Sequence, residues 1–67
     1  ASKLFTKFGF SPREKEVVSW VCRGKTSAEI ATILGISSRT VDKHMEHIFE
    51  KTGAESRIAL VALLNAR

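Results

Sequence analysis

The polar residues whose types and spacing could recognise a ligand lie in one stretch, GISSRTVDKHMEHIFEKTG, at residues 35–53. A helix advances by about 100° per residue, so one side of this stretch carries Arg39, Asp42, Lys43, Glu46, His47 and Glu50. A carboxylate there can accept a hydrogen bond from cytosine N4, and a lysine can donate to guanine O6 or N7. The nearly balanced charge fits a solvated, salt-bridged helix surface equally well. Both interpretations stay open on these residues alone.

The charge of the whole chain points to a polyanion as partner. Eleven Lys and Arg against seven Asp and Glu give a net charge of +4, although membranes and acidic proteins also attract positive charge. Phosphate contacts need not come from the residues that read bases. The other basic and hydroxyl residues could therefore form the rim of a DNA interface: Arg13, Arg23, Lys25, Lys51, Arg57, Thr26, Ser27, Ser38 and Thr40.

Catalysis and metal binding have weak support in the sequence. Cys22 flanks an apolar stripe, where a small buried hydrophobic residue is a better interpretation than a nucleophile activated by a histidine. His44 and His47 are three residues apart, but no third metal ligand has suitable spacing. We interpret His44 as a packing residue at the edge of the core that also reaches a phosphate. The sequence predicts no enzyme, metal or cofactor.

Four helices are expected to position these residues, and the first two begin with the same signal. In SPRE, Ser11 can cap a helix and Glu14 can close a capping box. That helix is expected to bury its valines and to end at Gly24. In TSAE, Thr26 and Glu29 repeat the pattern, and the second helix is short because Gly35 stops it.

The third helix is expected from a cap at Ser37 to about Thr52, and the fourth from a cap at Ser56 through residues 57–67. Val41, His44, Met45, Ile48 and Thr52 form the core stripe of the third helix. The sequence shows no repeat and no strand-like alternation. The prediction is an all-α, compact four-helix domain at residues 10–67, preceded by a linker or N-terminal arm at residues 1–9. Phe5, Phe8 and Phe10 are expected to dock on the core.

The connection between the second and third helices predicts a helix-turn-helix. In LGIS, Gly35 permits a positive φ, Ile36 fills the core and Ser37 starts the next helix. Ala31 supplies a small residue where the two backbones must approach. An ordinary corner between two helices in a small bundle remains the alternative.

The last helix, RIALVALLNAR, is apolar on nearly every side. Leu60, Val61 and Leu64 can fill the core, which leaves Ile58, Ala62 and Leu63 without an obvious burial site. A small domain has little body to surround them, so these three are expected to form a dimer interface. A buried terminal helix is one alternative. A small helical protein-interaction module that uses this helix without binding DNA is the other.

The length of 67 residues allows one domain. The apolar runs are too short to cross a membrane, and no signal-peptide pattern opens the chain, so a cytoplasmic location is expected. The chain starts at Ala1 without a methionine, which suggests that it is part of a longer protein.

The residues FSPREKEVVSWVCRGKTSAEIATILGISSRTVDKHMEHIFEKTGAESR resemble the LuxR-type (GerE-like) helix-turn-helix domain, and the match covers roughly residues 10–65. The resemblance implies the DNA-binding domain of a bacterial transcription regulator that binds inverted half-sites of double-stranded DNA as a homodimer through its last helix. It assigns base reading to Asp42, Lys43 and Glu46. It assigns phosphate contacts to Thr26, Ser27, Ser38, Arg39, Thr40, His44 and Lys51.

Three residues depart from the family pattern. Asp42 stands where the family often has lysine, Glu46 replaces a residue that is frequently polar or basic, and Ala28 replaces a common lysine. These departures leave the mode of binding intact but change the expected target sequence. They also predict a weaker non-specific affinity for DNA than in more basic relatives.

Overall fold

The computed structural model describes residues 8–65, which form four α-helices and no strand. The helices are α2 (Pro12–Cys22), α3 (Ser27–Leu34), α4 (Ser38–Thr52) and α5 (Arg57–Asn65). The predicted all-α, four-helix fold is confirmed. Phe5, which was expected to dock on the core, and the last two residues of the predicted fourth helix lie outside the described residues.

The helices begin where the caps were predicted. Ser11 and Glu14 form a complete capping box, as do Thr26 and Glu29. Ser37 Oγ accepts a hydrogen bond of 3.1 Å from the amide of Thr40. Ser56 Oγ accepts one of 3.1 Å from the amide of Ala59. Each cap satisfies an amide that the helix itself leaves without a partner.

The turn between α3 and α4 has the geometry of a helix-turn-helix. Gly35 follows α3 with a left-handed φ of 70° and ψ of 34°, and its amide donates to the carbonyl of Ala31. The amide of Ile36 donates to the same carbonyl at 3.0 Å. Ser37 then returns to an extended conformation and caps α4. Gly35, Ile36 and Ser37 therefore connect the two helices, and the amides of Gly35 and Ile36 both donate to the last turn of α3.

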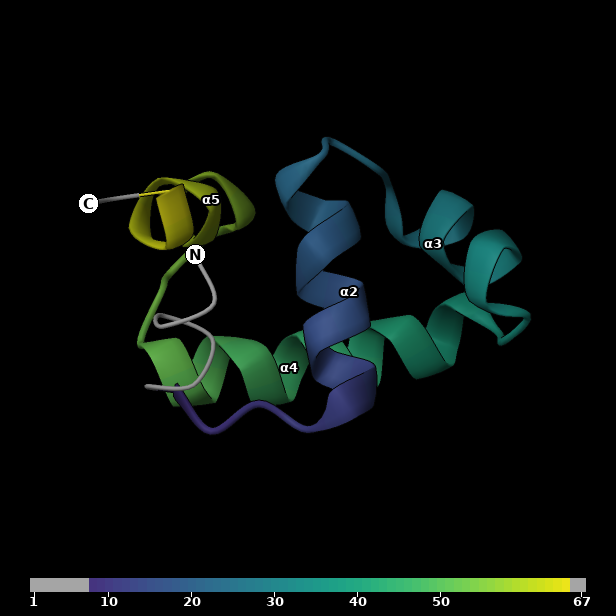
Figure 1. The fold of residues 1–67 in the computed structure, drawn as a ribbon, viewed down its shortest axis with the longest axis horizontal. Helices are drawn as coiled ribbons and strands as arrows, with labels where there is room; N and C mark the ends of the chain where they lie inside the picture. The colour runs from purple at the N-terminus through teal and green to yellow at the C-terminus, as the bar shows by residue number, and fades with distance from the viewer. Residues whose placement is uncertain (1–7, 66–67) are drawn as a thin grey trace.

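Helix α2 packs against each of the other three helices. In Figure 1, α4 runs along one edge of the molecule, α2 crosses it, and α3 and α5 lie on either side of α2. The packing of α3 on α4, α2 on α4 and α5 on α2 agrees with this view. The orientation of α4 is therefore fixed by contacts with two other helices.

The core comes from one face of each helix and from Phe10. Ile36, which was predicted to fill the core, is half-buried and packs against its edge, as does Leu34. The fully or nearly buried apolar residues are Phe10, Val17, Val18, Val21, Ile30, Ala31, Val41, Met45, Ile48, Leu60 and Leu64.

None of the helices in residues 8–65 has both the length and the apolar character that a membrane span requires.

Candidate nucleic-acid interface

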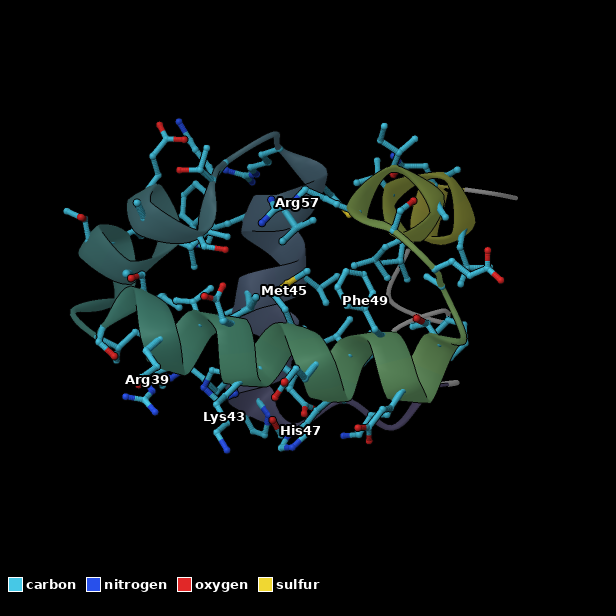
Figure 2. All side chains as sticks on the ribbon, turned by 180° about the vertical axis from the view of Figure 1, so that it is seen from behind. Arg39, Lys43, Met45, His47, Phe49 and Arg57 are labelled. Carbon is cyan, nitrogen blue, oxygen red and sulfur yellow. The ribbon has the colours of Figure 1, made fainter. Side chains whose placement is uncertain are left out.

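The rotation of α4 about its axis is set by burial of its apolar stripe. Val41, Met45 and Ile48 are at most 6% exposed, and leaving them in water would cost far more than any surface contact gains. Figure 2 shows Met45 and Phe49 pointing into the molecule, whereas Arg39 and Lys43 point away from α3 and α5. The predicted division of this helix into a core side and a polar side is therefore correct.

The predicted base readers come together on the polar side. Asp42, Lys43 and Glu46 are exposed and line one shallow depression together with Arg39. The salt bridges within residues 8–65 are formed by Glu14 and Glu16 with cations other than Arg39 and Lys43. None of the four side chains that line the depression therefore forms an ion pair there. The four charged groups are therefore open to solvent and to a ligand alike.

The hydroxyl residues predicted to contact phosphate lie at the starts of α3 and α4. Thr26, Ser38 and Thr40 are exposed, and Ser27 is half-buried. The amides at a helix N-terminus and the positive end of its dipole attract anions. Thr40 Oγ1 also shares a hydrogen bond of 2.9 Å with Ser37 Oγ, which orders the first turn of α4.

Other predicted rim residues contact their own helix. Arg13 lies 3.8 Å from the carboxylate of Glu16, and the guanidinium of Arg23 lies 5.1 Å from the ring centre of Trp20. Exposed pairs of this kind are weak, so both cations remain accessible. His44 is half-buried.

Lys51 differs from the other predicted phosphate contacts because its ammonium is already bonded inside the domain. Its Nζ lies 2.5 Å from Glu14 Oε1 and donates to the carbonyl oxygen of Gly9 at 3.1 Å. Glu14 was predicted only as part of a capping box. Its partner Lys51 is 37 residues away in the sequence, and no local pattern signals such a pair.

The carboxyl group of Glu14 is ionised more readily than an exposed one. Burial would raise its pKa, but hydrogen bonds from Lys51 and the Ser11 amide, with the positive charge of Lys51, hold the pKa below its usual value. His47 Nδ1 lies 3.8 Å from the second carboxylate oxygen, Oε2. The carboxylate thus joins the first turn of α2 to the second half of α4.

Arg57, also predicted at the rim, makes internal contacts as well. Its guanidinium donates a hydrogen bond of 2.6 Å to the carbonyl oxygen of Lys25 and one of 3.3 Å to Ser27 Oγ. These contacts join the first residue of α5 to the loop before α3. They span about 30 residues of sequence, so the sequence pattern gave no sign of them.

The three predicted interface residues of α5 do not share one surface. Ile58 is 82% exposed and lines an apolar groove with Ala62, next to Val21 and Val61. Leu63 is half-buried and lines a different depression, near Thr52–Ala54 and Ala59. The structure therefore brings two of the three together, and Leu63 has more burial than the sequence suggested.

Cys22 is the one cysteine of the chain, and its surroundings do not favour a catalytic thiolate. Burial raises the pKa of the Cys22 thiol, which keeps this half-buried group protonated and poorly nucleophilic at neutral pH. No group of three or more His, Cys, Asp or Glu side chains within residues 8–65 could hold a metal ion.

The short helix α3, joined by a tight turn to the longer α4 with its open polar face, forms a helix-turn-helix, an arrangement that DNA-binding domains use. The chain belongs to the LuxR family of bacterial regulatory proteins, whose family pattern matches residues 9–64. The family assignment carries DNA-binding transcription regulation as the general function.

Individual relatives agree with the family. The chain is 47% identical over 51 residues to regulatory protein SdiA of Escherichia coli, which is 76% of this chain and 21% of that protein. It is 48% identical over 50 residues to transcriptional activator protein AhyR of Aeromonas hydrophila, covering 75% and 19%. With YukR of Yersinia ruckeri, another transcriptional activator protein, identity is 54% over 43 residues, covering 64% and 19%. The chain spans about a fifth of the length of these relatives.

Proposed function

We propose that this chain is the DNA-binding domain of a longer transcription regulator and that α4 enters the major groove. The observation that carries the proposal is the unpaired polar face of α4, held outward by its buried stripe. Asp42, Lys43 and Glu46 would read base edges, with the end of α4 nearest the turn leading into the groove. The domain acts by binding, without catalysis or cofactor, in the bacterial cytoplasm where DNA lies.

Phosphate contacts are proposed around this reading surface. The starts of α3 and α4 present backbone amides and hydroxyls, and the side chain of Arg39 is exposed beside them. These groups can bind the DNA backbone on both sides of the groove and fix the register of α4. The residues proposed for this role are Thr26, Ser27, Ser38, Arg39, Thr40 and His44.

A homodimer through α5 is proposed to bind two inverted half-sites. The groove beside Ile58 is apolar and open, and Ile58 is the most exposed large apolar side chain in residues 8–65. Burying such side chains against a second copy of α5 is favourable. A two-fold protein pair matches the symmetry of inverted half-sites. Ile58 and Ala62 form the centre of this interface, and Leu63, which borders a different depression, lies outside it.

Binding to random duplex DNA at low salt tests the proposed function directly. Fluorescence anisotropy of a labelled duplex should show binding by the 67-residue chain that weakens steeply as salt rises, because released counterions drive association. Lys43→Ala should weaken binding, whereas the matched control Lys15→Ala, an exposed lysine on α2, should have a smaller effect. Absence of binding at low salt would favour the protein-interaction module instead.

A further inference from the structure

Glu14 is the only buried charged side chain in residues 8–65, with 4% of its surface exposed. A buried carboxylate without partners is strongly destabilising. Here Oε1 accepts hydrogen bonds from the amide of Ser11 at 2.8 Å and from Lys51 Nζ at 2.5 Å. Because Ser11 belongs to α2's cap and Lys51 to the last turn of α4, one carboxylate fixes two helices together.

The ammonium of Lys51 is committed to this arrangement. It has three hydrogen atoms to donate, and it is within bonding distance of Glu14 and of the Gly9 carbonyl oxygen. Its side chain is 35% exposed. Moving it to a DNA phosphate would leave Glu14 buried without its main partner, which is costly. Its positive charge is also offset by the carboxylate beside it.

His47 provides a second contact between the same carboxylate and α4. Its Nδ1 lies 3.8 Å from Glu14 Oε2, and its side chain is 57% exposed. His47 and Lys51 are four residues apart and so lie on the same side of α4. Glu14 therefore contacts α4 at two successive turns, both on the C-terminal side of the proposed reading residues Asp42, Lys43 and Glu46.

We propose that Lys51 is a positioning residue and not a phosphate contact: with Glu14 it forms an internal anchor that sets how α4 lies across α2. This inference rests on the proposed function, because the purpose of the anchor is to present Asp42, Lys43 and Glu46 to the bases. The anchor also includes the Gly9 carbonyl, so it joins the segment that leads into the domain to the proposed reading helix.

The two roles of Lys51 differ in their effect on salt dependence. A lysine that neutralises a phosphate contributes about one unit to the slope of log affinity against log salt. A lysine neutralised by Glu14 contributes almost nothing to this slope. Loss of the anchor instead misplaces the reading residues, which lowers discrimination between base sequences more than it lowers binding to random DNA.

The test compares Lys51→Met, Glu14→Gln and the double variant with the wild type. The probes are a duplex selected from a randomised library by the wild-type chain and a random duplex of equal length. Each single variant should lower the ratio of the two affinities by about tenfold with a nearly unchanged salt slope, and the double variant should add little, because residues of one network are not additive. Lys51→Arg, which keeps charge and donors, should retain most of the ratio.

Arg39→Ala serves as the control because this arginine is exposed, forms no ion pair in residues 8–65 and is proposed to contact phosphate; it should lower the slope by roughly one unit. A similar drop for Lys51→Met, with equal loss on both duplexes and no effect of Glu14→Gln, would overturn the anchor. Failure of the wild type to bind either duplex would instead overturn the proposed function. Circular dichroism confirms folding, and Glu14→Gln, which keeps the size of the side chain, provides the test if Lys51→Met does not fold.

Discussion

The guanidinium of Arg57 donates a hydrogen bond of 2.6 Å to the backbone carbonyl oxygen of Lys25. This bond connects α5, the proposed dimer helix, to the loop that leads into α3. A second bond of 3.3 Å reaches Ser27 Oγ at the first residue of α3. The start of α5 is therefore held beside a helix terminus that is proposed to contact phosphate.

Replacing Arg57 with methionine should lower the free energy of unfolding by about 1–3 kcal/mol, because the partly buried carbonyl of Lys25 loses its donor. Methionine keeps much of the apolar stem and removes only the guanidinium. Arg39→Met is the matched control: this arginine is exposed and unpaired, and the expected change is within about 0.5 kcal/mol. Urea denaturation measures both. Equal stability of the two variants would mean that the Arg57 bonds contribute nothing.

The lowered pKa of Glu14 predicts a specific loss of stability in acid. A carboxyl group whose pKa is depressed on folding stabilises the folded state above its unfolded pKa, here about 4.5, and this contribution is lost as pH falls through the folded pKa. The stability difference between wild type and Glu14→Gln should therefore be largest at neutral pH and shrink below pH 4.5. Thermal midpoints across this range measure it, and a difference independent of pH would contradict the prediction.

The left-handed conformation of Gly35 predicts which substitutions the turn tolerates. A Cβ at this position would meet no atom within 4 Å, so the cost of substitution comes from the backbone alone. Gly35→Val should destabilise by about 1–3 kcal/mol, because β-branched residues strongly disfavour a positive φ. Gly35→Asn should cost less, since asparagine adopts this conformation more readily. Thermal unfolding measures both variants, and equal midpoints for Gly35→Val and Gly35→Asn would rule out this explanation.

Glu46 is predicted to supply specificity and not affinity. A carboxylate in the groove is repelled by phosphates and recovers that loss only where a donor such as cytosine N4 is presented. Glu46→Gln should bind random DNA as well as or better than wild type, while discrimination at one base position falls by about 1–3 kcal/mol. A selection over randomised half-sites measures this. Glu50→Gln, one turn farther along α4, should leave the preference unchanged, and equal behaviour of both variants would argue against base reading by Glu46.

Ile58 is predicted to lie at the centre of a dimer contact. Ile58→Glu should prevent self-association but leave the fold intact, because Leu60 and Leu64 still occupy the core. Sedimentation at rising concentration, alone and on a duplex with two half-sites, detects the change. Ile33→Glu, which alters another exposed isoleucine on α3, is the control for added charge in the free protein. If the wild-type chain stays monomeric even on that duplex, the proposed dimer is wrong.

The caps and faces of the helices were predictable because their signals are local. Ser11 and Glu14 are three residues apart, and the two sides of α4 follow from a constant rotation per residue. The same local patterns and the family resemblance grouped Asp42, Lys43 and Glu46 before their shared depression was visible.

The long-range bonds were not predictable in this way. Lys51 was placed among the phosphate contacts by its charge and by the family resemblance, whereas its pairing with Glu14 depends on how α2 crosses α4. The bonds of Arg57 depend likewise on the position of α5 relative to the loop before α3. The same limit applies to Leu63, since sequence periodicity does not reveal that it and Ile58 border different hollows.

Lys51 bonds to Glu14 near the C-terminal end of α4, and the open depression that Asp42 lines lies nearer the N-terminal end. A small rotation of the helix at Lys51 therefore becomes a larger displacement at Asp42. Asp42 lies nine residues before Lys51, which corresponds to about 13 Å along the axis at the rise of an α-helix. A tilt of roughly 10° pivoting at Lys51 would then move Asp42 by about 2 Å, enough to break a hydrogen bond to a base. Val41, which is fully buried next to Asp42, would move by a similar distance, so a change near Gly9 reaches the proposed reading residues only if it also shifts the core.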